Sequence, residues 1–181
     1  PVVLVTGPRQ VGKTTVLQNC ETQPRTYVSL DTLENRELAK NDPTLFLQRY
    51  PAPVLIDEIQ YAPELFPYIK ASVDKEKKSG MYWLTGSQQF HLMKNVSESL
   101  AGRVGILQLE GLSQDEKNGH PDVPPFLPTE EYIKTKVHSA AETDLLKIYE
   151  LIWKGSYPKL YPADSDYWAV FYESYMQTYI E

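Results

Sequence analysis

Three closely spaced residues near the start of the chain restrict its fold more than any other feature. The stretch VTGPRQVGKTTVL places Gly7, Gly12 and Lys13 directly after the apolar run from Val2 to Thr6. Glycine loses more backbone freedom on folding than any other residue, so it is used where the backbone must take unusual angles or approach another group closely. The β-branched run predicts a buried strand, and the unbroken stretch from Lys13 to Cys20 predicts a helix. The sequence therefore predicts a tight loop between a strand and a helix.

The spacing within this loop matches G-x-x-x-x-G-K-[ST], the motif of a phosphate-binding loop. In such a loop, backbone N–H groups point inward and the helix N-terminus adds partial positive charge. We expect Lys13 to neutralise β- and γ-phosphates and the Thr14 hydroxyl to bind Mg²⁺. The alternative is a glycine-rich turn that matches by accident, and the flanking strand and helix argue against it. The residues expected to contact the nucleotide are Gly7, Pro8, Arg9, Gln10, Val11, Gly12, Lys13, Thr14 and Thr15.

Composition and charge exclude several classes of protein. The chain has 181 residues, 41% of them hydrophobic, which is enough for one full domain and part of another. Its net charge of −6 gives no general attraction to nucleic acid or to anionic membranes. No apolar run approaches the roughly 20 residues of a membrane span, and no signal peptide is visible. Cys20, the single cysteine, is interpreted as a buried thiol in the first helix. Since it allows no internal disulfide, we expect a cytoplasmic protein.

Predicted strands and helices alternate along the first part of the chain. Further strands are predicted at residues 26–30, 54–56, 82–85 and 104–109. Helices are predicted from Pro43 towards Tyr50, with Asp42 as the cap, from Pro63 to about Lys78, and from Phe90 to Leu100. This alternation predicts an α/β fold, a P-loop NTPase with a five-stranded parallel sheet flanked by helices.

A proline-rich stretch, residues 120–128, is interpreted as a linker that leaves the core. Before it, Ser113 and Glu116 have the spacing of a capping box. Helical patterns resume near Thr129, Thr143 and Asp166. We assign residues 1–113 to the P-loop core, residues 114–165 to a proline-rich linker and small helical lid, and residues 166–181 to the start of a truncated C-terminal domain.

The third strand carries the second part of the predicted chemistry. PVLIDEIQ places Asp57 and Glu58 at the carboxyl end of a buried strand, where open α/β sheets bind their ligands. We expect Asp57 to hold Mg²⁺ through its water shell and Glu58 to deprotonate the water that attacks the γ-phosphate. An acidic pair that only opens a loop is the alternative, which the upstream phosphate loop disfavours. Gln60 either contacts the nucleotide or caps the helix that begins at Pro63, with a slight preference for the cap.

Three further candidates lie between the predicted fourth and fifth strands. In WLTGSQQF, Ser87 and then Gln88 are candidates to hold the attacking water or the γ-phosphate. A glycine turn with polar residues is the alternative. In SLAGRVGIL, Arg103 either reaches the γ-phosphate of a neighbouring subunit, which implies a homo-oligomer, or is a surface arginine.

Together, GPRQVGKTT, LIDEIQ, PELFPYIK, LTGSQ and SLAGRV resemble the AAA-type P-loop ATPases of bacteria and archaea that carry an uncharacterised C-terminal domain. The resemblance covers roughly residues 2–113 and implies ATP and Mg²⁺ as ligands. It places Gly7, Gly12, Lys13 and Thr14 on the nucleotide, Asp57 on magnesium, Glu58 on water, Ser87 as a sensor and Arg103 as a possible arginine finger. GSYP, residues 155–158, resembles the family's turn near the nucleotide base, although Ser156 stands where a second glycine is common.

Three functions follow from these motifs, and ATP hydrolysis in a switch or motor core for an unknown protein client is the preferred one. A P-loop kinase for a small metabolite would close an arginine-bearing lid, and the chain has no arginine after Arg103. Such a kinase also has no use for Glu58, because activating water would waste ATP. A non-catalytic module that binds ATP and controls a partner is the remaining alternative. The missing arginine also predicts slow intrinsic turnover.

The last predicted helix is rich in aromatic residues. At about 100° per residue, DYWAVFYESYMQTYIE gathers its aromatic side chains on one broad face. The preceding helix, Leu145 to Trp153, is too short to cover that face. We therefore expect that the natural chain continues, and that in this segment the face is partly exposed or buried against another copy. The aromatic residues of this face are Tyr167, Trp168, Phe171, Tyr172, Tyr175 and Tyr179.

Overall fold

The structure is a computed structural model that describes residues 2–87, 90–120, 122, 126–139, 143–161 and 167–179. The chain divides into two compact units, Pro1–Glu110 and Gly111–Glu181. The boundaries that the sequence suggests at residues 113 and 165 stay predictions. Among the described residues, every helix is too short or too polar for a bilayer span.

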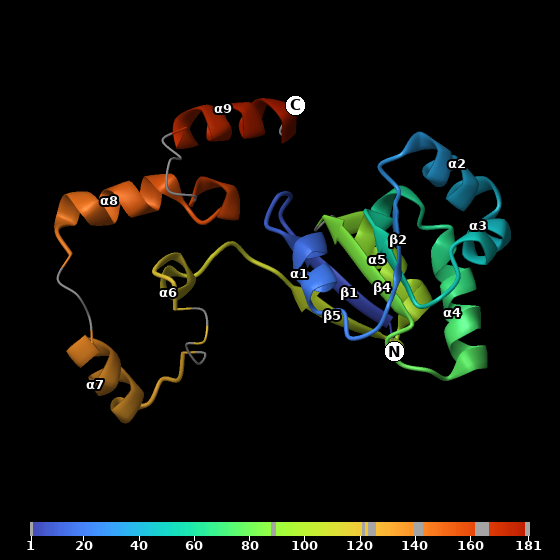
Figure 1. Ribbon diagram of the computed structural model, residues 1–181, viewed down its shortest axis with the longest axis horizontal. Coiled ribbons are helices and arrows are strands. Elements are labelled where there is room, and N and C mark those ends of the chain that lie inside the picture. Colours follow the sequence, from blue (N-terminus) through green and yellow to red (C-terminus); the bar gives the residue numbers. More distant parts are fainter. Residues whose placement is uncertain are drawn as a thin grey trace. The chain divides into compact units, whose positions relative to one another are not determined.

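The first unit is built on a five-stranded sheet in which all paired strands are parallel (Figure 1). This confirms the predicted α/β fold with a parallel sheet. The strand order is β2-β3-β4-β1-β5, so β4 lies between β1 and β3. The strands are β1 (Val2–Gly7), β2 (Thr26–Ser29), β3 (Val54–Asp57), β4 (Tyr82–Ser87) and β5 (Val104–Gln108).

Helices cover both faces of this sheet (Figure 1). Alternate residues of each strand point to opposite faces, so Leu4 of β1 joins the large core under α2 to α5, while Val5 packs with Leu17 of α1 on the other face. The larger core also holds Phe46 and Phe66, both fully buried. The helices are α1 (Lys13–Asn19), α2 (Leu33–Asn41), α3 (Pro43–Arg49), α4 (Leu65–Glu76) and α5 (Phe90–Leu100), with the short 3₁₀ helix η1 (Ile59–Tyr61) after β3.

Local signals in the sequence account for some of these helices and not for others. Asp42 caps α3 as predicted, since its carboxylate accepts a hydrogen bond from the Leu45 N–H at 2.9 Å. The helix α2 was not predicted, because it is polar and buries only Ala39. The prediction that Cys20 is buried within α1 was wrong. The helix ends at Asn19, and Cys20 is an exposed C-cap.

The second unit contains helices only, within its described residues. The predicted capping box is confirmed: Ser113 Oγ accepts from the Glu116 N–H at 3.2 Å, and the Glu116 carboxylate accepts from the Ser113 N–H at 2.7 Å. Asp166, near which a helical pattern resumes, lies outside the described residues. The elements are α6 (Gln114–Lys117), α7 (Glu130–Ser139), α8 (Leu145–Lys154), η2 (Pro158–Leu160) and α9 (Trp168–Tyr179).

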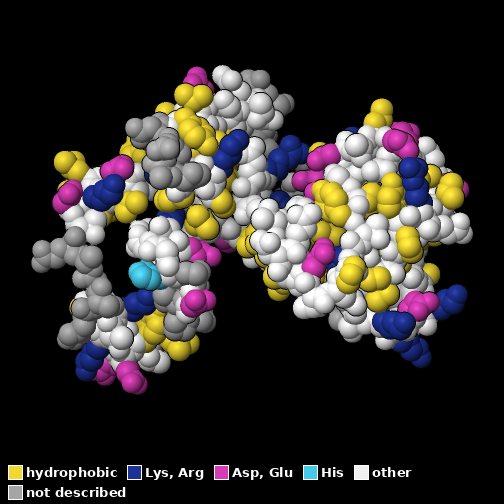
Figure 2. Space-filling model, in the orientation of Figure 1, with side chains coloured by type: hydrophobic (Ala, Val, Ile, Leu, Met, Phe, Trp, Pro, Cys, Tyr) yellow, Lys and Arg dark blue, Asp and Glu magenta, His cyan; other side chains and the backbone are white. Residues whose placement is uncertain are grey.

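The aromatic residues of α9 pack around one tyrosine of the turn before η2. The Tyr157 ring lies 5.4 Å from Phe171, 6.0 Å from Tyr172 and 5.4 Å from Tyr175, measured between ring centroids. Phe171 is buried as a result. The sequence did not anticipate this partner. The aromatic face is nevertheless partly exposed, as expected, since Tyr167 keeps 42% of its surface exposed. Hydrophobic side chains reach the surface of the molecule (Figure 2). Exposed ones lie on α8, including Leu145, Leu146 and Trp153, and also on α9, where Val170 and Met176 are exposed.

Candidate functional site

The carboxyl ends of three neighbouring strands bring the predicted motifs to one edge of the sheet. Gly7, the last residue of β1, pairs with Ser87, the last residue of β4. Asp57 ends β3, which is the next strand beyond β4. Because parallel strands end at the same edge, the loop after β1 lies beside both Ser87 and Asp57. This edge is where open α/β sheets bind ligands.

The two glycines of the loop are required for different reasons. A Cβ on Gly7 would lie 2.1 Å from the carbonyl oxygen of Leu109, so the backbone approach to Leu109 excludes a side chain. Gly12 has open space around it, but its φ of +94° is one that residues with side chains rarely adopt. Gln10 also has a positive φ, of 65°. The loop is thus a tightly folded turn that leads into the N-terminus of α1.

Lys13, the first residue of α1, is buried, and its side chain reaches back into the loop. Its Nζ donates to the carbonyl oxygens of Gly7 at 3.1 Å and Pro8 at 2.8 Å. Burial lowers the pKa of the Lys13 ammonium from its ordinary value of 10.5, and the nearby carboxylates of Glu58 and Asp57 act in the opposite direction. The buried Lys13 ammonium is therefore held close to two carboxylates.

Three hydroxyl groups surround the Asp57 carboxylate. Oδ1 accepts from Thr14 Oγ1 at 2.9 Å and also from Thr85 Oγ1, while Oδ2 accepts from the Tyr27 hydroxyl at 3.0 Å. The donors come from α1, β4 and β2. The sequence predicted that Thr14 and Asp57 act together, and the structure brings them into direct contact. It did not indicate Thr85 or Tyr27 as site residues, because their contact with Asp57 depends on the order of the strands.

Glu58 is held in an unusual backbone conformation, with φ 59° and ψ 47°. Its N–H donates to Thr85 Oγ1 at 3.2 Å, and its carboxylate accepts a hydrogen bond from Gln60 Nε2. The prediction that Gln60 caps the helix beginning near Pro63 was wrong. The N-cap of α4 is Glu64, with no side-chain cap, and the Gln60 amide is drawn to the nearby Glu58 carboxylate.

Ser87 presents a buried hydroxyl at the same edge. It is fully buried, and within the described residues its Oγ has no hydrogen-bond partner. Burying a hydroxyl without a partner costs free energy, so such a group calls for an explanation outside folding. Gln88, the second candidate here, lies outside the described residues.

Arg103 lies at the other end of the sheet. Its carbonyl oxygen accepts from the N–H of Val2, the first residue of β1, which is about 16 Å of extended strand away from Gly7. The guanidinium pairs with Asp74 of α4, with Nε–Oδ1 at 2.6 Å and Nη2–Oδ2 at 3.0 Å. The structure therefore does not bring Arg103 to the phosphate loop of its own chain.

The remaining loop residues lie around the same turn. Arg9 donates from Nη2 to the Tyr61 hydroxyl at 3.1 Å, and Arg36 lies over the Tyr61 ring, 4.0 Å from its centroid. Val11 is buried and Thr15 is exposed.

The GSYP turn belongs to the second unit, where Lys117 Nζ donates to the Gly155 carbonyl oxygen at 2.8 Å.

The oxygen atoms around Asp57 suit a magnesium ion that is held partly by phosphates, rather than a metal ion held by protein ligands alone. The described part of the chain has no group of three or more His, Cys, Asp or Glu side chains that could hold an ion. Mg²⁺ prefers oxygen ligands and is commonly held by one or two carboxylates together with substrate phosphates. Asp57 with the Thr14 hydroxyl beside the loop provides that kind of site.

Comparisons with known proteins find curated relatives in mycobacteria and a distant likeness to a solved structure. Uncharacterised proteins of Mycobacterium bovis and Mycobacterium tuberculosis are each 39% identical to this chain over 115 residues, which are 62% of this chain and 26% of each relative. The chain thus spans about a quarter of the length of these curated relatives. An unliganded sugar kinase from Janibacter sp. HTCC2649 aligns at 16% identity and a TM-score of 0.36, over 80% of this chain and 79% of the kinase. A structural likeness this distant carries no argument about function.

A family model described as an AAA domain matches residues 1–118. The match includes the phosphate loop, the acidic end of β3 and the end of β4. Such a domain is a nucleotide-binding one, which agrees with the turn around Lys13. Because the match covers well over half of the 181 residues, the chain belongs to the AAA domain family.

Proposed function

We propose that this chain binds Mg-ATP at the loop between β1 and α1 and hydrolyses it by in-line attack of water. The hydrogen bond of 2.9 Å between Thr14 and Asp57 is the observation that carries the proposal. Two motifs that are 43 positions apart in the chain meet at that bond. A hydroxyl next to a carboxylate, beside a loop that holds a lysine, is the arrangement by which P-loop enzymes hold a magnesium nucleotide.

The loop and the end of β3 divide the binding of Mg-ATP between them. The backbone N–H groups between Gly7 and Thr15 would bind phosphate oxygens, helped by the N-terminus of α1. Lys13 would exchange its carbonyl partners for the β- and γ-phosphates. Thr14 and Asp57 would hold Mg²⁺, which offsets phosphate charge when it is bound.

Hydrolysis would depend on the ends of β3 and β4. Glu58 would accept a proton from water as the water oxygen attacks the γ-phosphorus, and the bond to the ADP oxygen would break on the opposite side. The Ser87 hydroxyl would hold that water or a γ-phosphate oxygen. Arg103 would act on the nucleotide of a neighbouring subunit, in a cytoplasmic homo-oligomer that works as a switch or motor core for a protein client.

Phosphate release and nucleotide binding, measured on the same variants, test this proposal. Lys13→Ala removes the buried cation of the loop and should weaken Mg-ATP binding more than tenfold, about 1.4 kcal/mol. Glu58→Gln keeps the shape of the site, so it should bind ATP normally and release phosphate about 100-fold more slowly. Unchanged affinity in Lys13→Ala would show that the loop is not the site, and unchanged turnover in Glu58→Gln would assign the base to another group.

A non-catalytic ATP-binding module is the second candidate. The hydrogen bond from Gln60 to the Glu58 carboxylate favours it, because that bond occupies part of the proposed base. A wild-type protein that binds Mg-ATP but releases no phosphate would select this function over hydrolysis.

A further inference from the structure

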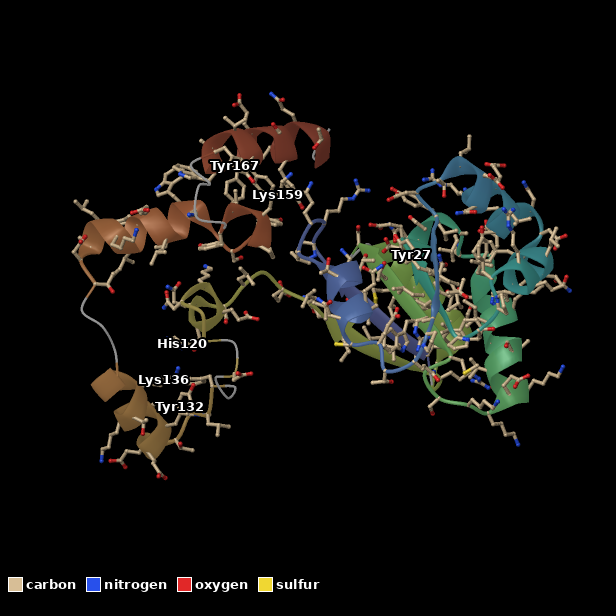
Figure 3. The ribbon with its side chains drawn as sticks, in the orientation of Figure 1. Tyr27, His120, Tyr132, Lys136, Lys159 and Tyr167 are labelled. Carbon is tan, nitrogen blue, oxygen red and sulfur yellow. The ribbon has the colours of Figure 1, made fainter. Side chains whose placement is uncertain are left out.

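One exposed tyrosine contacts the carboxylate to which we assign magnesium. Tyr27 lies on β2 in the first unit (Figure 3), and 46% of its surface is exposed. Its hydroxyl donates to Oδ2 of Asp57 at 3.0 Å. Tyr27 belongs to neither hydrophobic cluster of the first unit. The hydrogen bond to Asp57 is the contact that distinguishes it.

The register of the sheet explains why a tyrosine is needed at this position. Tyr27 pairs with Leu55 of β3, and Asp57 follows two residues later on the same face. Two residues of strand span about 6.6 Å, so a short polar side chain at position 27 would not reach the carboxylate. The long side chain of tyrosine runs along the sheet and places its hydroxyl at the strand end. Phenylalanine would keep the length and lose the hydrogen bond.

The acceptor positions of Asp57 show what this bond does. An ionised carboxylate offers about four acceptor positions, two on each oxygen. Thr14 and Thr85 both donate to Oδ1, while Tyr27 donates to Oδ2. The carboxylate turns about its Cβ–Cγ bond, and bonds to Oδ1 alone restrict that rotation less than bonds to both oxygens. The bond to Oδ2 fixes its plane, and one acceptor position of Oδ2 remains for a further donor.

We propose that Tyr27 is a positioning residue of the magnesium site. Its hydroxyl holds the Asp57 carboxylate so that the remaining acceptor position of Oδ2 meets a water of the hydrated ion. Outer contacts of this kind set the orientation of metal ligands and affect metal affinity strongly. The inference rests on the proposed function, because it assigns a role within the same magnesium nucleotide site.

Magnesium titrations of nucleotide binding test this role. The variant is Tyr27→Phe, and the matched control is Tyr68→Phe on α4. Tyr68 is 43% exposed, close to the 46% of Tyr27, and within the described residues no hydrogen bond to its hydroxyl is found. Binding of a fluorescent ATP analogue is measured without metal and across a range of Mg²⁺ concentrations. We expect Tyr27→Phe to raise the half-saturating Mg²⁺ concentration about tenfold, with metal-free affinity unchanged. Tyr68→Phe should behave as the wild type.

A second background shows whether Tyr27 acts through Asp57. In Asp57→Asn, adding Tyr27→Phe should change the magnesium dependence no further, because the carboxylate that Tyr27 holds is gone. A tenfold further loss in that background would overturn the inference. The inference would also be overturned if Tyr27→Phe had the same magnesium dependence as Tyr68→Phe. It would be overturned too if Tyr27→Phe weakened nucleotide binding without metal as much as it does with Mg²⁺.

These outcomes separate the inference from the proposed function. Wild-type protein whose nucleotide binding is indifferent to Mg²⁺ would overturn the proposed function and the role of Tyr27 with it. If nucleotide binding by the wild type depends on Mg²⁺ and Tyr27→Phe shows the same dependence, only the role of Tyr27 would be overturned.

Discussion

At the scale of single residues, two buried hydroxyls on β4 differ in how they are used. Thr85 donates to Asp57 and accepts from the Glu58 N–H, whereas Ser87 Oγ has no partner within the described residues. Removing the Thr85 hydroxyl would leave the Asp57 carboxylate and the Glu58 N–H without this hydrogen-bond partner. Thr85→Val should therefore lower the free energy of unfolding by about 1–3 kcal/mol. Ser87→Ala should leave it unchanged, yet slow phosphate release by roughly 100-fold, if the hydroxyl serves the reaction. Urea denaturation and phosphate release measure the two effects. Equal destabilisation by both changes would make Ser87 a structural residue.

The two glycines of the loop offer a similar comparison. Gly7→Ala would drive a Cβ into the Leu109 carbonyl, whereas Gly12→Ala meets open space and bears only its backbone strain. We expect Gly7→Ala to lower the free energy of unfolding by about 2 kcal/mol more than Gly12→Ala does. Denaturant titration of both variants measures this difference. Equal losses would mean that Leu109 moves aside easily.

At the scale of elements, the strands and the loop could be predicted because their signals are local. Apolar β-branched runs mark β1 and β3, and the motif residues of the loop are contiguous in the chain. The helix α2 lacked such a signal, since only Ala39 is buried. Tyr27 and Thr85 could not be assigned to the site, because their contacts arise when β3 lies between β2 and β4. Local patterns do not encode the order of the strands.

The link between α4 and β5 yields a prediction at this scale. Arg103, just before β5, pairs with Asp74 on α4, and both side chains are partly exposed. Such a pair contributes little stability, so a loss of hydrolysis in Arg103→Ala would not reflect unfolding. We expect Arg103→Ala to bind ATP and hydrolyse it slowly, while Asp74→Asn, which removes the same pair and keeps the arginine, hydrolyses normally. Mixing Arg103→Ala with Lys13→Ala subunits should restore phosphate release.

The Arg103–Asp74 pair keeps its charges near neutral pH. The hydrogen bond from Arg103 lowers the pKa of Asp74 below its ordinary value of 3.8. The pair therefore persists at neutral pH, and its contribution is lost only as the pH falls through that lowered pKa. Failure of the mixed subunits to recover activity, with assembly confirmed, would leave Arg103 with no role on a neighbouring nucleotide.

At the scale of the whole molecule, the two compact units have separate cores. The core of the first unit lies between the sheet and its helices, and the proposed ATP site belongs to that unit. In the second unit, the aromatic rings of α9 gather around Tyr157. Tryptophan fluorescence can follow the unfolding of each unit, since Trp83 is in the first unit and Trp153 and Trp168 are in the second.

We therefore predict that Tyr157→Ala destabilises the second unit alone, by about 3 kcal/mol, because three ring contacts and their buried area are lost. Calorimetry should show an early transition for this unit. Mg-ATP at 100 times its dissociation constant should stabilise only the later transition, by about 2.7 kcal/mol, because a ligand stabilises the unit that binds it. Tyr68→Phe, in the first unit, serves as the control and should leave the early transition where it is in the wild type. A single transition that shifts as a whole with both Tyr157→Ala and Mg-ATP would mean that the two units unfold as one.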